Sequence, residues 1–345
     1  MLTEKQIREI KRHLDKAQNP LFFFDNDLDG LCSFLLLQRY IKRGKGVPLK
    51  SFPDMTGDYF RKVEELNADY IFILDKPLVS KEFFEKVQQV NIPVVWIDHH
   101  DIDIKEIPKF VYYYNPLFNK DKKNEPVTAL CYQVSDSKED LWIAVIGCIY
   151  DKFVPSFYKE FVRDYSDLAI NSENAFNIYY NSEIGKIARI LNFALKDRTT
   201  NVIGMLKFLI KVKTPYEILE ESNQNRSIYS RFKQIDSKYQ KLLKKAISLM
   251  SSGNFFFFQF GGDLSISSDL ANELSYRFPE KIIVVAYING IKANLSIRGK
   301  KIREKVLKVI QELNNANGGG HEDAVGAKIM TEDLKKFKES LIKLI

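Results

Sequence analysis

The first half of the chain repeats one hydrophobic pattern, in which a short apolar run ends in acidic residues and gives way to a stretch with helical periodicity. Apolar runs at 21–24, 70–74 and 94–97 have the length of strands, and apolar residues with helical spacing follow at about 31–43 and 81–90. This alternation predicts an α/β fold with a parallel sheet. Because the carboxyl ends of parallel strands share one edge of a sheet, we expect the acidic residues after these strands to converge there.

The second half begins with a charged helical stretch and then returns to an α/β pattern. The stretch from about 182 to 250 predicts a connector between domains. After it, the pattern predicts strands at 255–260, 282–287 and 293–297, helices at 269–277 and 302–313, a glycine loop at 318–320 and a terminal helix. We therefore predict a catalytic domain at 1–190, a helical connector at 191–252 and a smaller α/β substrate-binding domain at 253–345.

Composition narrows the class of protein and the kind of partner. The chain is 45% hydrophobic, and none of its apolar stretches approaches the roughly 18 residues of a membrane span. Residues 1–20 form a charged amphipathic pattern rather than a signal peptide, and the 3 cysteines form no CxxC motif, so we expect a cytoplasmic protein. The net charge of +7 favours a polyanionic partner. Basic residues at 231–245 are expected to form a solvated helix face, although they could also follow a nucleic-acid backbone.

Carboxylate and imidazole side chains are concentrated where the predicted strands end. Hard divalent cations need several oxygen ligands, and an imidazole beside the carboxylates shifts the preference toward Mn²⁺ or a similar transition metal. A helical run at 141–150 brings one more aspartate to the same edge. The candidate metal ligands are Asp25, Asp27, Asp29, Asp75, His99 and Asp151.

Two other interpretations of these aspartates compete with a metal site. Asp25, Asp27, Asp29 and Gly30 match the first half of an EF-hand calcium loop, but the twelfth position is Leu36, where that loop needs a bidentate Glu. A single aspartate after an apolar run is more often a turn former or a helix cap than a metal ligand. Capping does not explain why an Asp-His-His motif and a histidine-bearing glycine loop accompany the aspartates. The sequence therefore favours a metal site.

Taken in order, these segments resemble the motifs of DHH phosphoesterases of the RecJ type. The resemblance rests on 25–30 (DNDLDG), Leu74-Asp75, Asp98-His99-His100, 147–151 (GCIYD) and 318–321 (GGGH), and it extends to Asn115-Pro116, Leu191-Asn192 and Ser296-Ile297-Arg298. It thus covers nearly the whole chain. The resemblance implies a DHH catalytic domain followed by a smaller DHH-associated domain, with the substrate held in the cleft between them.

The resemblance also implies a reaction, the hydrolysis of single-stranded DNA or RNA with two ions of Mn²⁺, or of Mg²⁺, that activate a water and stabilise the leaving oxygen. Asp75 would bridge the ions, and His100 would contact the scissile phosphate or orient a ligand. Asp75, His99 and His100 are the expected catalytic residues, and the remaining expected ligands are Asp25, Asp27, Asp29 and Asp151. The residues expected to bind substrate phosphates are Arg298, Gly318, Gly319, Gly320 and His321.

Two further functions remain open at the level of sequence. Many relatives carry a histidine at the position of Phe23, and RecJ relatives that lost ligands serve as scaffolds of the replicative helicase. An inactive scaffold with replication or repair proteins as partners is therefore one alternative. The other is a nano-RNase or a cyclic-dinucleotide phosphodiesterase, which shares the same catalytic motifs. Metal titration separates the first alternative from an exonuclease, and the dependence of cleavage on chain length separates the second.

Overall fold

A computed structural model gives the fold of residues 1–49 and 55–345. This part of the chain forms two compact units, Met1–Phe232 and Lys233–Ile345, and helix α12 (Arg226–Ser248) begins in the first and ends in the second. The three-part division at 190 and 252 stays a prediction. No helix within the described residues is both long and apolar enough to cross a membrane.

The sheet of the first unit has five parallel strands in the order β2-β1-β3-β4-β5, which confirms the predicted α/β class. From β1 the chain moves first to one neighbour and then to the other, so the order reverses between β1 and β3. In sheets of this kind, ligands bind at the carboxyl ends of the strands beside such a reversal. The strands are β1 (Pro20–Asp25), β2 (Lys45–Leu49), β3 (Tyr70–Leu74), β4 (Val94–Ile97) and β5 (Val111–Tyr114).

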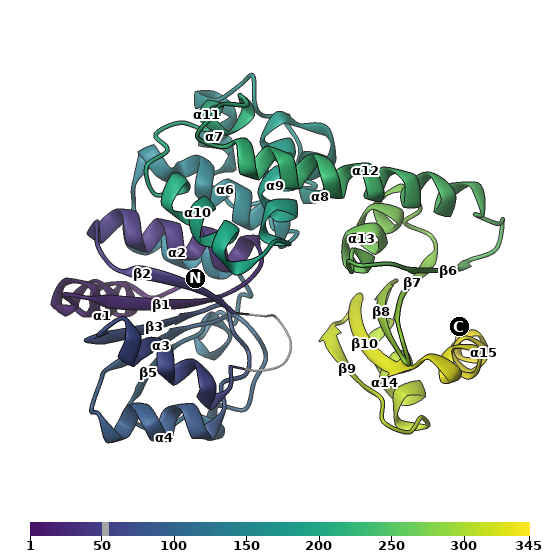
Figure 1. Ribbon diagram of the computed structural model, residues 1–345, viewed down its shortest axis with the longest axis horizontal. Coiled ribbons are helices and arrows are strands. Elements are labelled where there is room, and N and C mark those ends of the chain that lie inside the picture. The colour runs from purple at the N-terminus through teal and green to yellow at the C-terminus, as the bar shows by residue number, and fades with distance from the viewer. Residues whose placement is uncertain (50–54) are drawn as a thin grey trace. The chain divides into compact units, whose positions relative to one another are not determined.

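Both faces of this sheet are covered, which is why its strands read as continuous apolar runs. Phe22 and Phe24 belong to the core on the side of α2 (Leu28–Ile41), and both rings pack against Phe34 of that helix. Phe23 points the other way, into a second core on the side of α3 (Phe60–Glu65) and α4 (Lys81–Gln89). Figure 1 shows these helices on opposite faces of the sheet.

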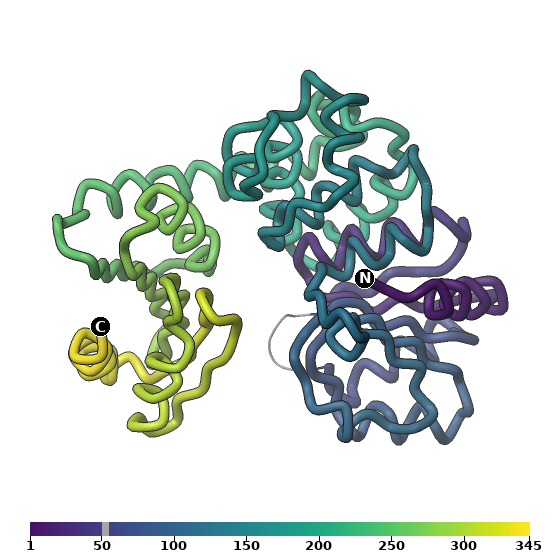
Figure 2. Tube along the Cα trace, turned by 180° about the vertical axis from the view of Figure 1, so that it is seen from behind, coloured from purple at the N-terminus to yellow at the C-terminus, as the bar shows by residue number. Residues whose placement is uncertain are grey.

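Further helices gather on the same side as α2. Helix α6 packs directly on α2, and both are apolar on all sides because both are buried. Figure 2 shows this helical layer from behind. The helices of the first unit outside the strand crossovers are α1 (Glu4–Lys16), α5 (Val127–Ser135), α6 (Leu141–Tyr150), α7 (Tyr158–Asp164), α8 (Ala175–Asn181), α9 (Glu183–Leu195), α10 (Thr199–Leu209) and α11 (Tyr216–Leu219).

The second unit has a mixed sheet in the order β6-β7-β8-β10-β9, in which only β6 and β7 run parallel. Helix α13 (Ser267–Arg277) packs against β7 and β8, whereas α14 (Arg303–Gln311) packs against β9, β10 and α15 (Leu334–Leu344). The strands are β6 (Phe255–Gly261), β7 (Ile282–Asn289), β8 (Lys292–Arg298), β9 (Asn317–His321) and β10 (Ala324–Met330).

The predicted glycine loop at 318–320 is wrong in its secondary structure. These residues form β9, an exposed edge strand that pairs antiparallel with β10. Glycine weakens a strand and offers no side chain to pack, so the sequence carried no strand signal there. The pattern also omitted β2, β5 and β10, and it started α2 too late, because the acidic turn and the first turn of that helix overlap.

Candidate metal centre

The acidic turn after β1 is held tightly against the start of α2. Asp25 ends β1, and Asp27 caps α2 by accepting a hydrogen bond from the Gly30 amide at 3.0 Å. A Cβ atom at Gly30 would lie 2.3 Å from the carbonyl oxygen of Asp25, so only glycine lets the helix begin this close to the strand. The turn therefore places Asp25, Asp27 and Asp29 within a short stretch at the carboxyl edge of the sheet.

Asp29 links this turn to the next helix. Its carboxylate accepts hydrogen bonds from the backbone amides of Val127 at 2.9 Å and Thr128 at 2.7 Å, which are the first residues of α5. Asp29 thus caps α5, and it is 2% exposed. Its Oδ2 atom also lies 4.0 Å from Nε2 of His99. One carboxylate therefore holds two helices in place and faces the histidine motif.

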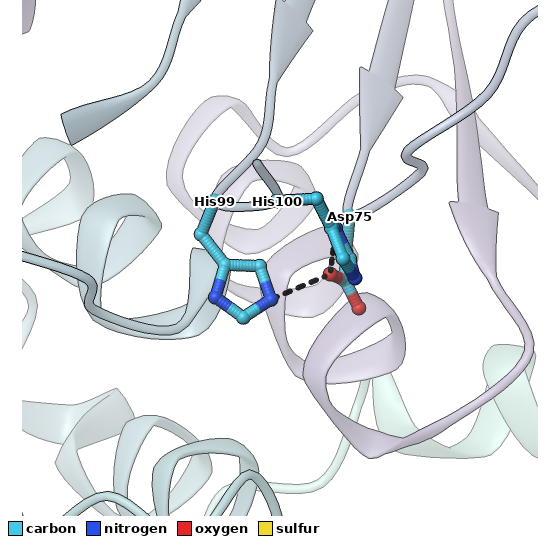
Figure 3. Close-up of side chains that lie close together, drawn as sticks. All are labelled: Asp75, His99 and His100. Carbon is cyan, nitrogen blue, oxygen red and sulfur yellow. Dashed lines mark ion pairs between the residues drawn. The ribbon is translucent and has the colours of Figure 1, made fainter. Parts of the chain in front are cut away.

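Asp75 lies directly after β3 in a left-handed backbone conformation, with φ of 57°. It is 3% exposed, and its Oδ1 atom is buried without a hydrogen-bond partner among the residues that the structure describes. Figure 3 shows this oxygen facing both imidazoles, 3.4 Å from Nε2 of His99 and 3.9 Å from Nδ1 of His100. A buried carboxylate oxygen that accepts no hydrogen bond is costly unless a cation meets it. This orphaned oxygen fits a metal ligand.

The two histidines follow β4 and are oriented by polar neighbours. Nδ1 of His99 lies 3.0 Å from Oδ1 of Asn124, and Nε2 faces Asp29 and Asp75. Nδ1 of His100 lies 2.8 Å from Oδ1 of the fully buried Asp98. Burial opposes ionisation of Asp98, but the hydrogen bond and charge of His100 prevail and lower its pKa. The ring of His100 is therefore held by an ionised partner.

A hydrogen-bond network behind His100 was not predicted from the sequence. The Tyr113 hydroxyl donates to Asp98 at 3.3 Å, and the side-chain amide of Asn115 donates to the Tyr113 hydroxyl and to the His100 carbonyl, both at 2.8 Å. These residues belong to β5 and the turn after it, an element that the pattern had missed. Asn115 entered the sequence argument only as part of the family resemblance.

Within residues 1–49 and 55–345, two overlapping groups of ligand atoms could hold a metal ion: Asp75 with His99 and His100, and Asp29 with His99 and Asp151. Within each group these atoms all lie within 4.8 Å of one another. Asp151 is the residue after α6, and its Oδ2 atom lies 3.9 Å from Nδ1 of His99. The structure thus brings together residues that are widely separated in the chain, as the strand-end argument predicted.

Electrostatics within the cluster also favours a bound cation. Burial, reinforced by neighbouring carboxylates, raises the pKa values of Asp27 and Asp75 well above the usual range. Burial and Asp29 raise the pKa of Asp151 to about 6, against the lowering effect of the histidines. Burial opposes protonation of His99, but Asp151, Asp29 and Asp98 outweigh it and raise its pKa. A metal ion would relieve this mutual repulsion, since it favours the ionised form of every carboxylate near it.

The structure places two predicted positions differently from the rest. The carboxylate of Asp25 lies 3.6 Å from the ammonium of Lys76, and neither Asp25 nor Asp27 is in the groups of ligand atoms found among the described residues. Phe23 is fully buried and makes edge-to-face contacts with Tyr59 and Phe83. No pattern in the sequence pointed to Lys76, because a lysine in a loop is almost always solvated.

The predicted substrate-binding residues lie in the second unit. Arg298 is 9% exposed and donates from Nε to Asn272 at 2.6 Å and from Nη2 to Ser268 at 3.0 Å. Residues 318–321 are exposed along β9. The backbone nest expected for a glycine loop is replaced by a paired edge strand, whose amides follow the ladder with β10.

Two family models match separate parts of the chain. The model of the DHH family, N-terminal domain, matches residues 21–147, and the DHHA1 domain model matches residues 228–345. No curated protein matches the chain by sequence.

Solved structures share the fold at low identity. RecJ from Thermus thermophilus in complex with Mn²⁺ matches with a TM-score of 0.69 at 14% identity, over 98% of this chain and 53% of that chain. The present chain therefore spans about half the length of that protein. An exonuclease RecJ bound to manganese gives 0.65 at 14% identity, over 98% and 92%. CDC45 from Entamoeba histolytica gives 0.54 at 12% identity, over 98% of each chain.

Proposed function

Because the chain belongs to the DHH superfamily and has a RecJ-like fold, we propose that it is a metal-dependent phosphodiesterase that hydrolyses single-stranded nucleic acid. The observation that carries this proposal is the convergence of Asp29, Asp75, His99, His100 and Asp151, with an Asp75 oxygen that accepts no hydrogen bond. The net charge of +7 fits a polyanionic substrate.

The proposed cofactor is Mn²⁺, with two ions held by Asp27, Asp29, Asp75, His99 and Asp151, and Mg²⁺ as a substitute. When bound, such ions activate a water and stabilise the leaving oxygen. His99 would present Nε2 as a ligand atom because Asn124 binds Nδ1. Asp98 would orient the ring of His100 through Nδ1, so that Nε2 faces the scissile phosphate. In the second unit, Arg298, His321 and those amides of Gly318, Gly319 and Gly320 that point away from β10 would bind substrate phosphates.

A scaffold in a replication complex is the second candidate, favoured by the match to CDC45 along the full length of both chains. Replication or repair proteins would then be its partners. A scaffold has no need of a cation at Asp75, so the orphaned oxygen of that residue supports the hydrolase. Binding of Mn²⁺ to the purified protein, followed by calorimetry, separates the two functions, because the scaffold is expected to bind no ions at this cluster.

The proposal is tested by nuclease assays on end-labelled single-stranded DNA and RNA with Mn²⁺, using substrates from dinucleotides to long oligonucleotides and a cyclic dinucleotide. We expect the wild type and Asp101→Ala to release nucleotides and Asp75→Ala to release none. Asp101 is a matched control, since it is exposed and adjoins the histidine motif. Inactivity of the wild type on every substrate would contradict the hydrolase, and cleavage of dinucleotides alone would restrict it to short substrates.

A further inference from the structure

A lysine lies buried beside the candidate metal centre. Lys76 directly follows Asp75, and its side chain is 1% exposed. Its ammonium lies 3.6 Å from Oδ1 of Asp25, whose side chain is 12% exposed. This ion pair joins the carboxyl ends of β3 and β1, the neighbouring strands between which the sheet order reverses. The lysine therefore adds a fixed positive charge where carboxylates are concentrated.

The backbone around Lys76 is held on both sides of β3. Asp75 has a φ of 57°, a left-handed conformation that turns the chain sharply after the strand. The carbonyl oxygen of Lys76 accepts a hydrogen bond from the indole of Trp96, on the neighbouring strand β4, at 3.0 Å. Trp96 is itself 3% exposed. Lys76 is thus anchored through its carbonyl on one side and through its ammonium on the other.

Burial of the ammonium constrains Asp25. A buried charge persists only with a counter-charge and satisfied hydrogen bonds, and removal of one partner of such a pair is strongly destabilising. Asp25 supplies such a counter-charge. Its Oδ1 atom also accepts the amide of Asn26 at 3.0 Å, which fixes the carboxylate at the strand end. Asp25 and Asp27 are both absent from the groups of ligand atoms found among the described residues, so the ion pair with Lys76, rather than this absence, sets Asp25 apart.

We propose that Lys76 is a positioning residue that acts as an internal cation of the centre, so that Asp25 balances Lys76 instead of ligating a metal ion. Asp27, Asp29, Asp75 and Asp151 then carry the negative charge that two divalent cations neutralise. By holding Asp25 out of the ligand set, Lys76 limits how tightly the centre binds metal, because affinity rises with the number of anionic ligands. The statement about metal affinity rests on the proposed function, whereas the ion pair does not.

The ion pair is tested first in metal-free protein, by thermal unfolding in excess EDTA. Asp25→Asn should lower Tm by about 10 °C, because it removes the carboxylate that faces a buried ammonium. Lys76→Met keeps the length of the side chain and should lower Tm less, since the carboxylate of Asp25 reaches solvent. The double variant should recover most of the loss. Additive losses in the double variant would overturn the proposal.

Calorimetric titration with Mn²⁺ then tests the effect on metal. Lys76→Met should bind Mn²⁺ about tenfold more tightly than the wild type, because it releases a carboxylate. Asp25→Asn should bind Mn²⁺ more weakly than the wild type. The double variant should have an Mn²⁺ affinity within about threefold of the wild type and bind the same number of ions. A purely structural role for Lys76 predicts no gain in affinity. Loss of an ion in the double variant would identify Asp25 as a ligand and overturn the proposal.

Asp140→Asn provides a matched control. Asp140 forms another buried ion pair in the same unit, with Arg39 at 2.7 Å, and lies at the other end of α6 from Asp151. This variant should lower Tm without changing Mn²⁺ affinity. If the wild type binds no Mn²⁺, the proposed function fails, while recovery of Tm in the metal-free double variant still supports the ion pair. Failure of the two ideas is therefore distinguishable.

Discussion

The two units differ in how deeply their predicted functional residues are buried. In the first unit, Asp75 and His99 are 3% and 4% exposed and are fixed by strand ends and helix starts. In the second unit, His321 and its glycines are exposed along the edge strand β9. A metal centre can be pre-organised, because buried carboxylates and imidazoles fix one another's positions before a cation binds. A surface that binds phosphate has to remain accessible, so its geometry is completed by the ligand.

Arg298 stands between these extremes. It is nearly as buried as the residues of the metal centre, yet its guanidinium donates to two neutral side chains, those of Asn272 and Ser268. These two hydrogen bonds hold the guanidinium in a fixed orientation. On the proposed function, the first unit would therefore hold a pre-organised metal centre, and the second unit would combine the oriented Arg298 with the exposed strand β9.

The largest expected effect comes from removal of the charge at the orphaned oxygen. Asp75→Asn should lower the rate of phosphodiester hydrolysis by about a thousandfold, because loss of a metal ligand forfeits several kcal/mol of transition-state stabilisation. The same change should raise Tm of the metal-free protein by about 3 °C, since it removes a carboxyl whose pKa is raised by burial and by repulsion from the neighbouring carboxylates. Rates on labelled oligonucleotides and thermal unfolding in EDTA check both effects.

The control for this prediction is Asp101→Asn, which changes an exposed carboxylate of the same loop and should alter neither quantity. A thousandfold loss of activity accompanied by a fall in Tm would mean that Asp75 supports the fold rather than the chemistry. This outcome would contradict a pre-organised metal centre in the first unit.

A histidine introduced at position 23 should not become a ligand of the metal centre. Phe23 points into the core beside Tyr59 and Phe83, so Phe23→His should destabilise the protein by about 3 kcal/mol by burying a polar ring without a partner. Chemical denaturation measures this loss, and Phe23→Leu, which keeps the site apolar, should lose about 1 kcal/mol. An increase in the number of Mn²⁺ ions bound by Phe23→His would show instead that position 23 reaches the metal centre.

The sequence predicted the first unit better than the second for a physical reason. Strands buried on both faces are continuous apolar runs, and the acidic residues after them mark one edge of the sheet, so convergence around Asp75 and His99 followed from pattern alone. The edge strand β9 consists largely of glycine and pairs only through its backbone, which leaves no hydrophobic signal.

Other features depended on contacts that no local pattern encodes. The ion pair of Lys76 with Asp25 joins residues on adjacent strands, and lysine is ordinarily a surface residue. The support of His100 by Asp98, Tyr113 and Asn115 requires the register between β4 and β5. Such tertiary hydrogen bonds become visible only once the strands are aligned.

In the second unit, removal of a surface imidazole should affect binding rather than chemistry. His321→Ala should raise KM for single-stranded oligonucleotides by about tenfold and leave kcat within about twofold, because a lost charge-assisted contact to phosphate costs roughly 1.5 kcal/mol. Steady-state kinetics check the split, with Glu322→Gln as an exposed neighbour that should change neither constant. A fall in kcat alone would place His321 in the reaction and remove the contrast between the units.

The smallest effect is expected on α12. Lys241 and Lys245 are exposed one turn apart, and on the same helix Lys238 is already paired with Asp263 at 2.7 Å. We expect this face to be solvated, so the double variant Lys241→Gln, Lys245→Gln should change affinity for single-stranded nucleic acid by less than about twofold in salt near physiological strength. If both lysines contacted phosphates, the slope of log affinity against log salt would fall in magnitude by about 1.4, since each contact to a single strand contributes about 0.7. Filter binding across a salt series measures that slope. An unchanged slope would confine nucleic-acid binding to the residues already predicted in the second unit. A shallower slope would extend the binding surface along α12.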